Sequence, residues 1–303
     1  MDATTLSRIA TLKKEHNIVI LAHNYQRPEI QDAADFVGDS LDLAIKATKT
    51  TANVIIFCGV TFMAEAAKIL NPDKTVIIPD PTSTCPMANM VNPTDLRLLK
   101  KKHPKAAVMA YINTNADVKV LADICCTSAN GVDVARSLTQ QEIIFVPDKN
   151  LGTYIQQQVP EKNMILWPGS CSTHVHILAD DIRALQQQHP HALTLVHPEC
   201  NPDVIALADY ATSTNGMVTY AKDSPATEFI IGTEQGLCHR LKKEIPNKTF
   251  YPLPKALCPN MKKTTIENLI NSMETLEPEI ELPETIMQQA RIPLQRMMNL
   301  GRK

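Results

Sequence analysis

The chain has 303 residues, of which 44% are hydrophobic and 20% charged, so it can bury a core and is not expected to be disordered. Its net charge of −2 and its short lysine runs lack the basic field that a nucleic-acid surface needs. The start of the chain is polar, unlike a signal peptide, and no apolar run is long enough to cross a bilayer. We therefore expect a soluble cytoplasmic protein whose eight cysteines are thiols or metal ligands rather than disulfides.

The sequence repeats one pattern three times. Each repeat begins with an apolar run typical of a buried parallel strand, which ends in His23, Tyr111 or His197. An aspartate follows 12 positions later, at Asp35, Asp123 and Asp209. A hydroxyl residue follows 5 positions after each aspartate, at Ser40, Ser128 and Thr214. Agreement at three kinds of position indicates a triplicated unit.

Each repeat continues with two more apolar runs and closes with a proline and a cysteine. The second strands are predicted at residues 54–57, 143–146 and 229–231, and the third strands at residues 76–78, 164–166 and 249–251. Strands that alternate with helical stretches predict parallel sheets, with all strand carboxyl ends on one edge. The predicted fold class is α/β, with three pseudo-repeated αβα units, each a small parallel sheet, around a pseudo-threefold axis.

The repeats also predict the boundaries of the units. The first unit is expected at residues 1–84, the second at 85–170 and the third at 171–257. Residues 258–275 form the third cysteine loop and a return helix. The tail, residues 276–303, has apolar residues at helical spacing and is expected to pack back on the first unit, with Pro293 kinking or restarting the helix.

Only three of the cysteines follow the repeat: Cys85, Cys171 and Cys258, which are 86 and 87 positions apart. If the units surround a common axis, the three thiols converge on it. Three symmetric thiolates can hold a [4Fe-4S] cluster and leave one iron without a protein ligand. Two alternatives stay open here: a zinc site with water or His174 as the fourth ligand, and cysteines that are merely buried.

Several long motifs resemble the quinolinate synthase family. They are His23-Asn24-Tyr25-Gln26-Arg27-Pro28-Glu29, Tyr111-Ile112-Asn113-Thr114, Pro168-Gly169-Ser170-Cys171, His197-Pro198-Glu199-Cys200 and Cys258-Pro259-Asn260-Met261. The single cysteine at position 258 is similar to the short form of the family. The resemblance implies that iminoaspartate and dihydroxyacetone phosphate condense to quinolinate, phosphate and water in NAD biosynthesis. It also implies a [4Fe-4S] cluster whose open iron acts as a Lewis acid, and a functional link to L-aspartate oxidase.

The resemblance also gives roles to the polar residues at strand ends and helix starts. Glu199 is expected to be the main acid or base, with His197 beside it and Tyr25 in carbon–carbon bond formation or proton transfer. His23, Tyr111 and Asn113 are expected to orient substrate carboxylates. Ser40, Ser128, Ser213 and Thr214 are expected to bind anions at helix amino termini, where capping is the alternative role. The roles of His174 and Lys222 stay open.

Two other classes of function remain possible from the residues. One is a different three-cysteine enzyme of this architecture, of the diphthamide-synthesis or isoprenoid diphosphate reductase type, although the His-Asn-Tyr-Gln and His-Pro-Glu motifs are foreign to it. The other is a non-enzymatic redox sensor built on a cluster, which would need no acid–base group at the metal.

Overall fold

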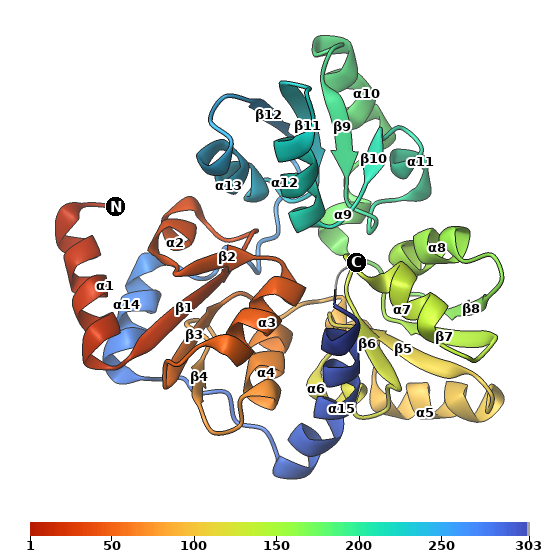
Figure 1. Ribbon diagram of the computed structural model, residues 1–303, viewed down its shortest axis with the longest axis horizontal. Coiled ribbons are helices and arrows are strands. Elements are labelled where there is room, and N and C mark those ends of the chain that lie inside the picture. The colour runs from red at the N-terminus through yellow and green to blue at the C-terminus, as the bar shows by residue number, and fades with distance from the viewer. Residues whose placement is uncertain (302–303) are drawn as a thin grey trace.

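The computed structural model describes residues 1–301, and within them the chain forms three four-stranded parallel sheets, one in each repeat. The strand orders are equivalent: β2-β1-β3-β4, β6-β5-β7-β8 and β10-β9-β11-β12. Figure 1 shows three lobes grouped around a common centre, each with its helices packed beside its sheet. The predicted α/β class with three pseudo-repeated αβα units is confirmed.

The elements follow each other in the same sequence in each unit. The first unit contains α1 (Ala3–Glu15), β1 (Ile18–His23), α2 (Pro28–Ala33), β2 (Phe36–Gly38), α3 (Ser40–Lys49), β3 (Val54–Cys58), α4 (Thr61–Leu70) and β4 (Thr75–Ile77). The second contains η1 (Ala88–Met90), α5 (Pro93–Lys102), β5 (Ala107–Tyr111), α6 (Ala116–Lys119), β6 (Ile124–Cys126), α7 (Gly131–Ser137), β7 (Glu142–Val146), α8 (Lys149–Gln158) and β8 (Asn163–Leu166). The third contains α9 (Ser172–Val175), α10 (Ala179–Gln188), β9 (Leu193–Val196), α11 (Pro202–Ile205), β10 (Tyr210–Ala211), α12 (Thr214–Asp223), β11 (Glu228–Gly232), α13 (Leu237–Glu244) and β12 (Thr249–Pro252).

The repeated aspartate ties the first strand of each unit to the segment before the next strand. The carboxylates of Asp35, Asp123 and Asp209 accept hydrogen bonds of 2.8, 2.7 and 2.7 Å from backbone N–H groups within β1, β5 and β9. The backbone N–H of each aspartate donates back to the carbonyl of the same strand residue, at 2.9 Å in all three units. The aspartate period seen in the sequence therefore has a structural cause.

One strand of each sheet escaped the sequence analysis. The edge strands β2, β6 and β10 are only three, three and two residues long, too short to show a period of two. They matter because the helices that start just beyond them, α3, α7 and α12, carry or follow the repeated hydroxyl residues. The edge strand therefore helps to place Ser40, Ser128 and Thr214.

The chain ends in α14 (Ile266–Thr275) and α15 (Glu284–Leu300). Helix α14 packs on α1 and β3 of the first unit, whereas α15 packs against β6 and α6 of the second unit and α4 of the first. Figure 1 shows α15 between these two lobes. Helix α15 continues through Pro293 without restarting. The unit boundaries proposed from the repeats stay a prediction.

The hydrophobic cores follow the same division. The largest buried cluster joins the first two units through α15, and the third unit has its own clusters on the two faces of its sheet. Across residues 1–301, no helix combines the length and the apolar character that a bilayer span requires.

Candidate functional site

A cavity lies where the carboxyl ends of the strands of all three units meet. The predicted residues that line it are His23, Tyr25, Ser40, Cys85, Tyr111, Asn113, Ser128, Cys171, His197, Glu199, Thr214 and Cys258. Residues far apart in the chain are brought together here because right-handed crossovers place all strand carboxyl ends of a parallel sheet on one edge.

Two residues considered at the sequence level lie elsewhere. Ser213 is buried but is not among the described residues that line this cavity. It is the N-cap of α12, and its Oγ accepts a 3.1 Å hydrogen bond from the Gly216 N–H. Lys222 forms an ion pair with Glu244, and its side chain is 46% exposed. The structure thus gives Ser213 a capping contact and Lys222 a surface contact.

A backbone contact, repeated in each unit, fixes the three cysteine loops. The N–H of the third residue after strand β3, β7 or β11 donates to the carbonyl that lies two residues before the cysteine. The three pairs are Thr61 N to Ser83 O at 2.8 Å, Lys149 N to Gly169 O at 2.7 Å and Gln235 N to Ala256 O at 2.8 Å. We refer to these pairs as the backbone clasps. Through the same contact in each unit, they position Cys85, Cys171 and Cys258 at the cavity.

The three thiols are free, half-buried and close enough to influence one another. Burial raises the pKa of Cys85 to about 12, and the nearby Cys258 adds to the shift. Burial also raises the pKa of Cys171, with Glu199 and Cys85 adding to it. Three soft sulfur donors on one cavity wall suit a metal or cluster that would replace the thiol protons.

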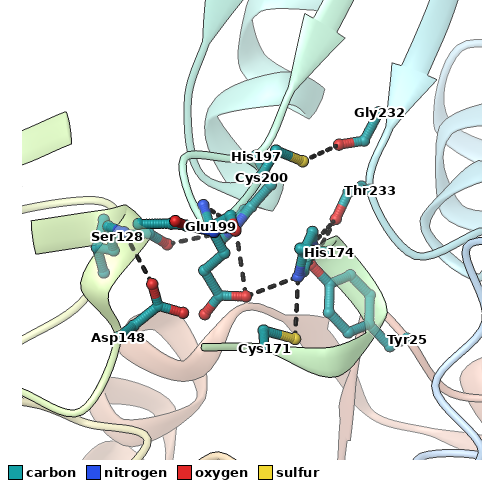
Figure 2. Close-up of polar contacts among 12 residues, drawn as sticks. Tyr25, Ser128, Asp148, Cys171, His174, His197, Glu199, Cys200, Gly232 and Thr233 are labelled. Atoms are coloured by element: carbon teal, nitrogen blue, oxygen red, sulfur yellow. Dashed lines mark hydrogen bonds and ion pairs between the residues drawn. The ribbon is translucent and has the colours of Figure 1, made fainter. Parts of the chain in front are cut away.

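Glu199 lies at the centre of a buried polar group that Figure 2 shows in detail. Its Oε2 is 2.7 Å from Nδ1 of His174 and 3.6 Å from Nδ1 of His197. The same His174 nitrogen is 3.1 Å from Sγ of Cys171. Cys171, His174 and Glu199 offer three ligand atoms within 4.8 Å of one another. The other oxygen of Glu199, Oε1, is buried without a hydrogen-bond partner.

A second chain of contacts links Tyr25 to this group. The hydroxyl of Tyr25 is 2.6 Å from Oγ1 of Thr233, which lies 2.8 Å from Nε2 of His174. His174 is fully buried, so it does not lie on the protein surface. Thr233 was missed at the sequence level. Its place directly after the apolar run of β11, at the carboxyl end of a parallel strand, is the signal that could have identified it.

The buried titratable groups of this site differ in their charge states. Burial lowers the pKa of His23 and of His197 to about 3, so both imidazoles are neutral near pH 7. Burial alone would raise the pKa of Glu199, but the adjacent His174 and His197 outweigh it and hold that pKa at about 2. Glu199 is therefore held as an ionised carboxylate in a site shielded from water.

Hydroxyl groups and helix amino termini also line the cavity. Ser40 is the first residue of α3, and Thr214 is the first residue of α12. Oγ1 of Thr214 accepts a 2.9 Å hydrogen bond from Nδ2 of Asn24. Oγ of Ser128 is 3.1 Å from Nε2 of His197. Such positions can bind anions, because helix amino termini offer free N–H groups and partial positive charge.

Comparison with known proteins adds an independent line of evidence. A family model described as "Quinolinate synthetase A protein" matches residues 7–299. The chain is 50% identical over 297 residues to "Quinolinate synthase" of Thermodesulfovibrio yellowstonii, covering 98% of both chains. It is also 50% identical to "Quinolinate synthase 1" of Methanosarcina acetivorans over 98% of both chains. For "Quinolinate synthase" of Methanoregula boonei the identity is 50% over 99% of this chain and 100% of the relative.

Proposed function

The chain belongs to the quinolinate synthetase A family, and on that basis we propose that it makes quinolinate from iminoaspartate and dihydroxyacetone phosphate. Matches over nearly the full length support this reading over the alternatives of another three-cysteine enzyme or a redox sensor. The active site proposed for the reaction is the cavity where the three units meet.

The proposed cofactor is a [4Fe-4S] cluster held by Cys85, Cys171 and Cys258. The thiols fit such a group because they come from equivalent loops, face one cavity and carry no disulfide. A zinc site completed by His174 is less favoured, since both ring nitrogens of His174 already contact Glu199 and Thr233. When bound, the cluster would supply a Lewis-acidic iron without a protein ligand.

Binding of the anionic substrates is proposed to rest on hydroxyl and amide groups. Ser40, Ser128 and Thr214 would donate to carboxylate or phosphate oxygens at helix starts. Asn113 would orient a substrate N–H or O–H group, because its Oδ1 is buried without a partner and the residue lines the cavity. His23 and Tyr111 would complete the enclosure around the substrate carboxylates. Ser213, expected to bind an anion, is better explained as the cap that orders α12 beneath Thr214.

Proton transfer is proposed to depend on Glu199 and the Tyr25 chain. Glu199 is ionised and its Oε1 has no partner, so that oxygen can accept a proton from the substrate. His197, neutral and 3.6 Å from Glu199, would assist. The hydroxyls of Tyr25 and Thr233 and the His174 ring form a path of short contacts through which a proton can move during condensation and ring closure.

The observation that carries this proposal is the convergence of three cysteines and Glu199 on one cavity. The test is an assay of anaerobically prepared protein with iminoaspartate and dihydroxyacetone phosphate, followed by chromatography for quinolinate. We expect quinolinate and phosphate in equal amounts. Iron-loaded protein that forms no quinolinate would overturn the proposal.

Two wider predictions rest on the same proposal. Iminoaspartate must be supplied by an enzyme that oxidises aspartate, so the functional link to L-aspartate oxidase stays a prediction. A cytoplasmic location, without nucleic-acid or membrane partners, also stays a prediction.

A further inference from the structure

Two buried acidic side chains occupy equivalent places in the second and third units. Asp148 and Glu234 each lie two residues after the end of a strand, β7 or β11, and directly before the donor of a backbone clasp. Both side chains are fully buried. Val60 holds the same place in the first unit, two residues after β3. The pseudo-threefold repeat therefore places a carboxyl group behind two of the three cysteine loops.

The contacts of Glu234 reach the cysteine loop itself. Its Oε1 accepts a 3.2 Å hydrogen bond from the backbone N–H of Cys258, and its Oε2 accepts a 2.7 Å bond from the Gly236 N–H. The ammonium group of Lys262, four residues after Cys258, lies 2.9 Å from Oε1. Lys262 also donates to the carbonyl of Tyr25 at 2.5 Å. Glu234 thus joins both ends of the Cys258 loop and links it to the first unit.

Asp148 holds the equivalent position in the second unit, but its carboxylate makes different contacts from those of Glu234. Its Oδ1 accepts a 2.8 Å hydrogen bond from the Leu151 N–H at the start of α8. Its other oxygen, Oδ2, is buried and has no hydrogen-bond partner in the described part of the chain. Figure 2 shows the Asp148 carboxyl beside that of Glu199, which in this view lies between Asp148 and Cys171. No cationic group is paired with Asp148 among the ion pairs of residues 1–301, unlike Glu234.

We propose that Glu234 is a positioning residue that holds the Cys258 loop in register for metal binding. The inference rests on the proposed cluster, but not on catalysis. Groups behind a metal ligand commonly set its orientation, and their loss costs roughly 10- to 100-fold in metal affinity. The Cys85 loop is held differently: Oγ of Ser83 lies 2.9 Å from the carbonyl oxygen of Gly59 and 2.7 Å from that of Asn260, and its single proton can be donated to either.

The test compares Glu234→Ala and Glu234→Gln with the wild type in the full chain isolated anaerobically. Glu228→Ala is the matched control, since Glu228 begins the same strand β11 and its carboxylate accepts a 2.8 Å hydrogen bond from the Tyr251 hydroxyl. A ferrous chelator is added and iron release is followed by absorbance. We expect release to be about 10- to 100-fold faster in Glu234→Ala, less accelerated in Glu234→Gln, and unchanged in the control.

Hydrogen exchange provides a readout that does not depend on the metal. Peptides that contain Cys258 should exchange faster in Glu234→Ala, whereas peptides that contain Cys85 should keep wild-type rates. If Glu234→Ala does not fold, Glu234→Gln must still release iron faster than the control.

The possible failures can be told apart. A wild-type chain that takes up no iron would contradict the proposed cluster. In that case, hydrogen exchange of the peptides that contain Cys258 would still test whether Glu234 positions the loop. Folded Glu234 variants with wild-type iron release and wild-type exchange at Cys258 would overturn the inference. Equal acceleration in Glu228→Ala would also overturn it, because the effect would then be a general loss of stability.

Discussion

At the residue scale, the carboxylate of Glu199 is the group on which the proposed proton transfer depends. We expect Glu199→Gln to reduce kcat by about 10²- to 10⁴-fold, the usual contribution of a general acid or base. The amide keeps the shape of the side chain and an oxygen that can accept from His174, so iron content should not change. Steady-state kinetics and iron analysis on the same preparation check both statements. A variant with full turnover would exclude Glu199 from proton transfer.

A second residue-scale prediction concerns the hydroxyl of Thr214. Asn24 donates to Oγ1 of Thr214, and Oδ1 of Asn24 accepts a 3.0 Å bond from Arg240, which fixes the orientation of the amide. The Thr214 proton is therefore free to donate to a substrate anion in the cavity. In Asn24→Asp the new carboxylate would take that proton and repel the anion. We expect KM to rise roughly 10- to 100-fold, as for loss of a hydrogen bond to a charged group, with a smaller change in kcat.

Asn215→Asp is the matched control for this prediction. Oδ1 of Asn215 also accepts from Arg240, at 2.9 Å, but Asn215 does not line the cavity. Its KM should stay near the wild-type value. Equal increases in KM for the two variants would mean that charge alone, and not the orientation of Thr214, controls substrate binding.

At the scale of elements, α15 contributes to stability by closing the seam between the first and second units. Leu294 is fully buried in that seam, whereas Ile292 on the same helix is 52% exposed. We expect Leu294→Ala to lower the free energy of unfolding by about 2–5 kcal/mol, through lost burial and a residual cavity. Ile292→Ala should change it by less than about 0.5 kcal/mol. Urea unfolding followed by circular dichroism measures both, and equal midpoints would show that α15 is not part of the core.

The elements also show what the sequence could and could not predict. The repeated apolar runs identified three of the four strands of each sheet, the first, third and fourth in chain order. The spacing of Ser40, Ser128 and Thr214 identified positions at or near helix starts that line the cavity. Thr233 and the burial of His174 were not predictable in this way, because their contacts join different units and leave no periodic signal. Lys119 is a further example. It is fully buried and donates to the Ile112 carbonyl at 2.9 Å, although a lysine in a short helix is ordinarily solvated.

At the scale of the whole molecule, triplication explains why the residues that line the cavity, including the proposed catalytic and metal-binding groups, come from all parts of the chain. Each unit contributes one strand-end residue, one hydroxyl at or near a helix start and one cysteine loop to the cavity. The units are not identical in function, because His23 and His197 are replaced by Tyr111 in the second unit, and only the third carries Glu199. Under the proposed function, the symmetric cysteines would form the metal-binding frame, and the residues that depart from the symmetry would carry out the acid–base chemistry.

The same symmetry gives a prediction that separates the proposed ligands from the other cysteines. Substituting Cys85, Cys171 or Cys258 with Ala removes one of three equivalent ligands, so we expect each variant to lose the brown chromophore and most of its iron and sulfide. Cys58 and Cys238 are buried in separate hydrophobic clusters of the first and third units, away from the cavity. Cys58→Ala and Cys238→Ala should therefore retain wild-type iron and sulfide, measured on anaerobic preparations. Retention of the full cluster in any one of the first three variants would contradict the three-cysteine site, and loss of it in Cys58→Ala would point to a different set of ligands.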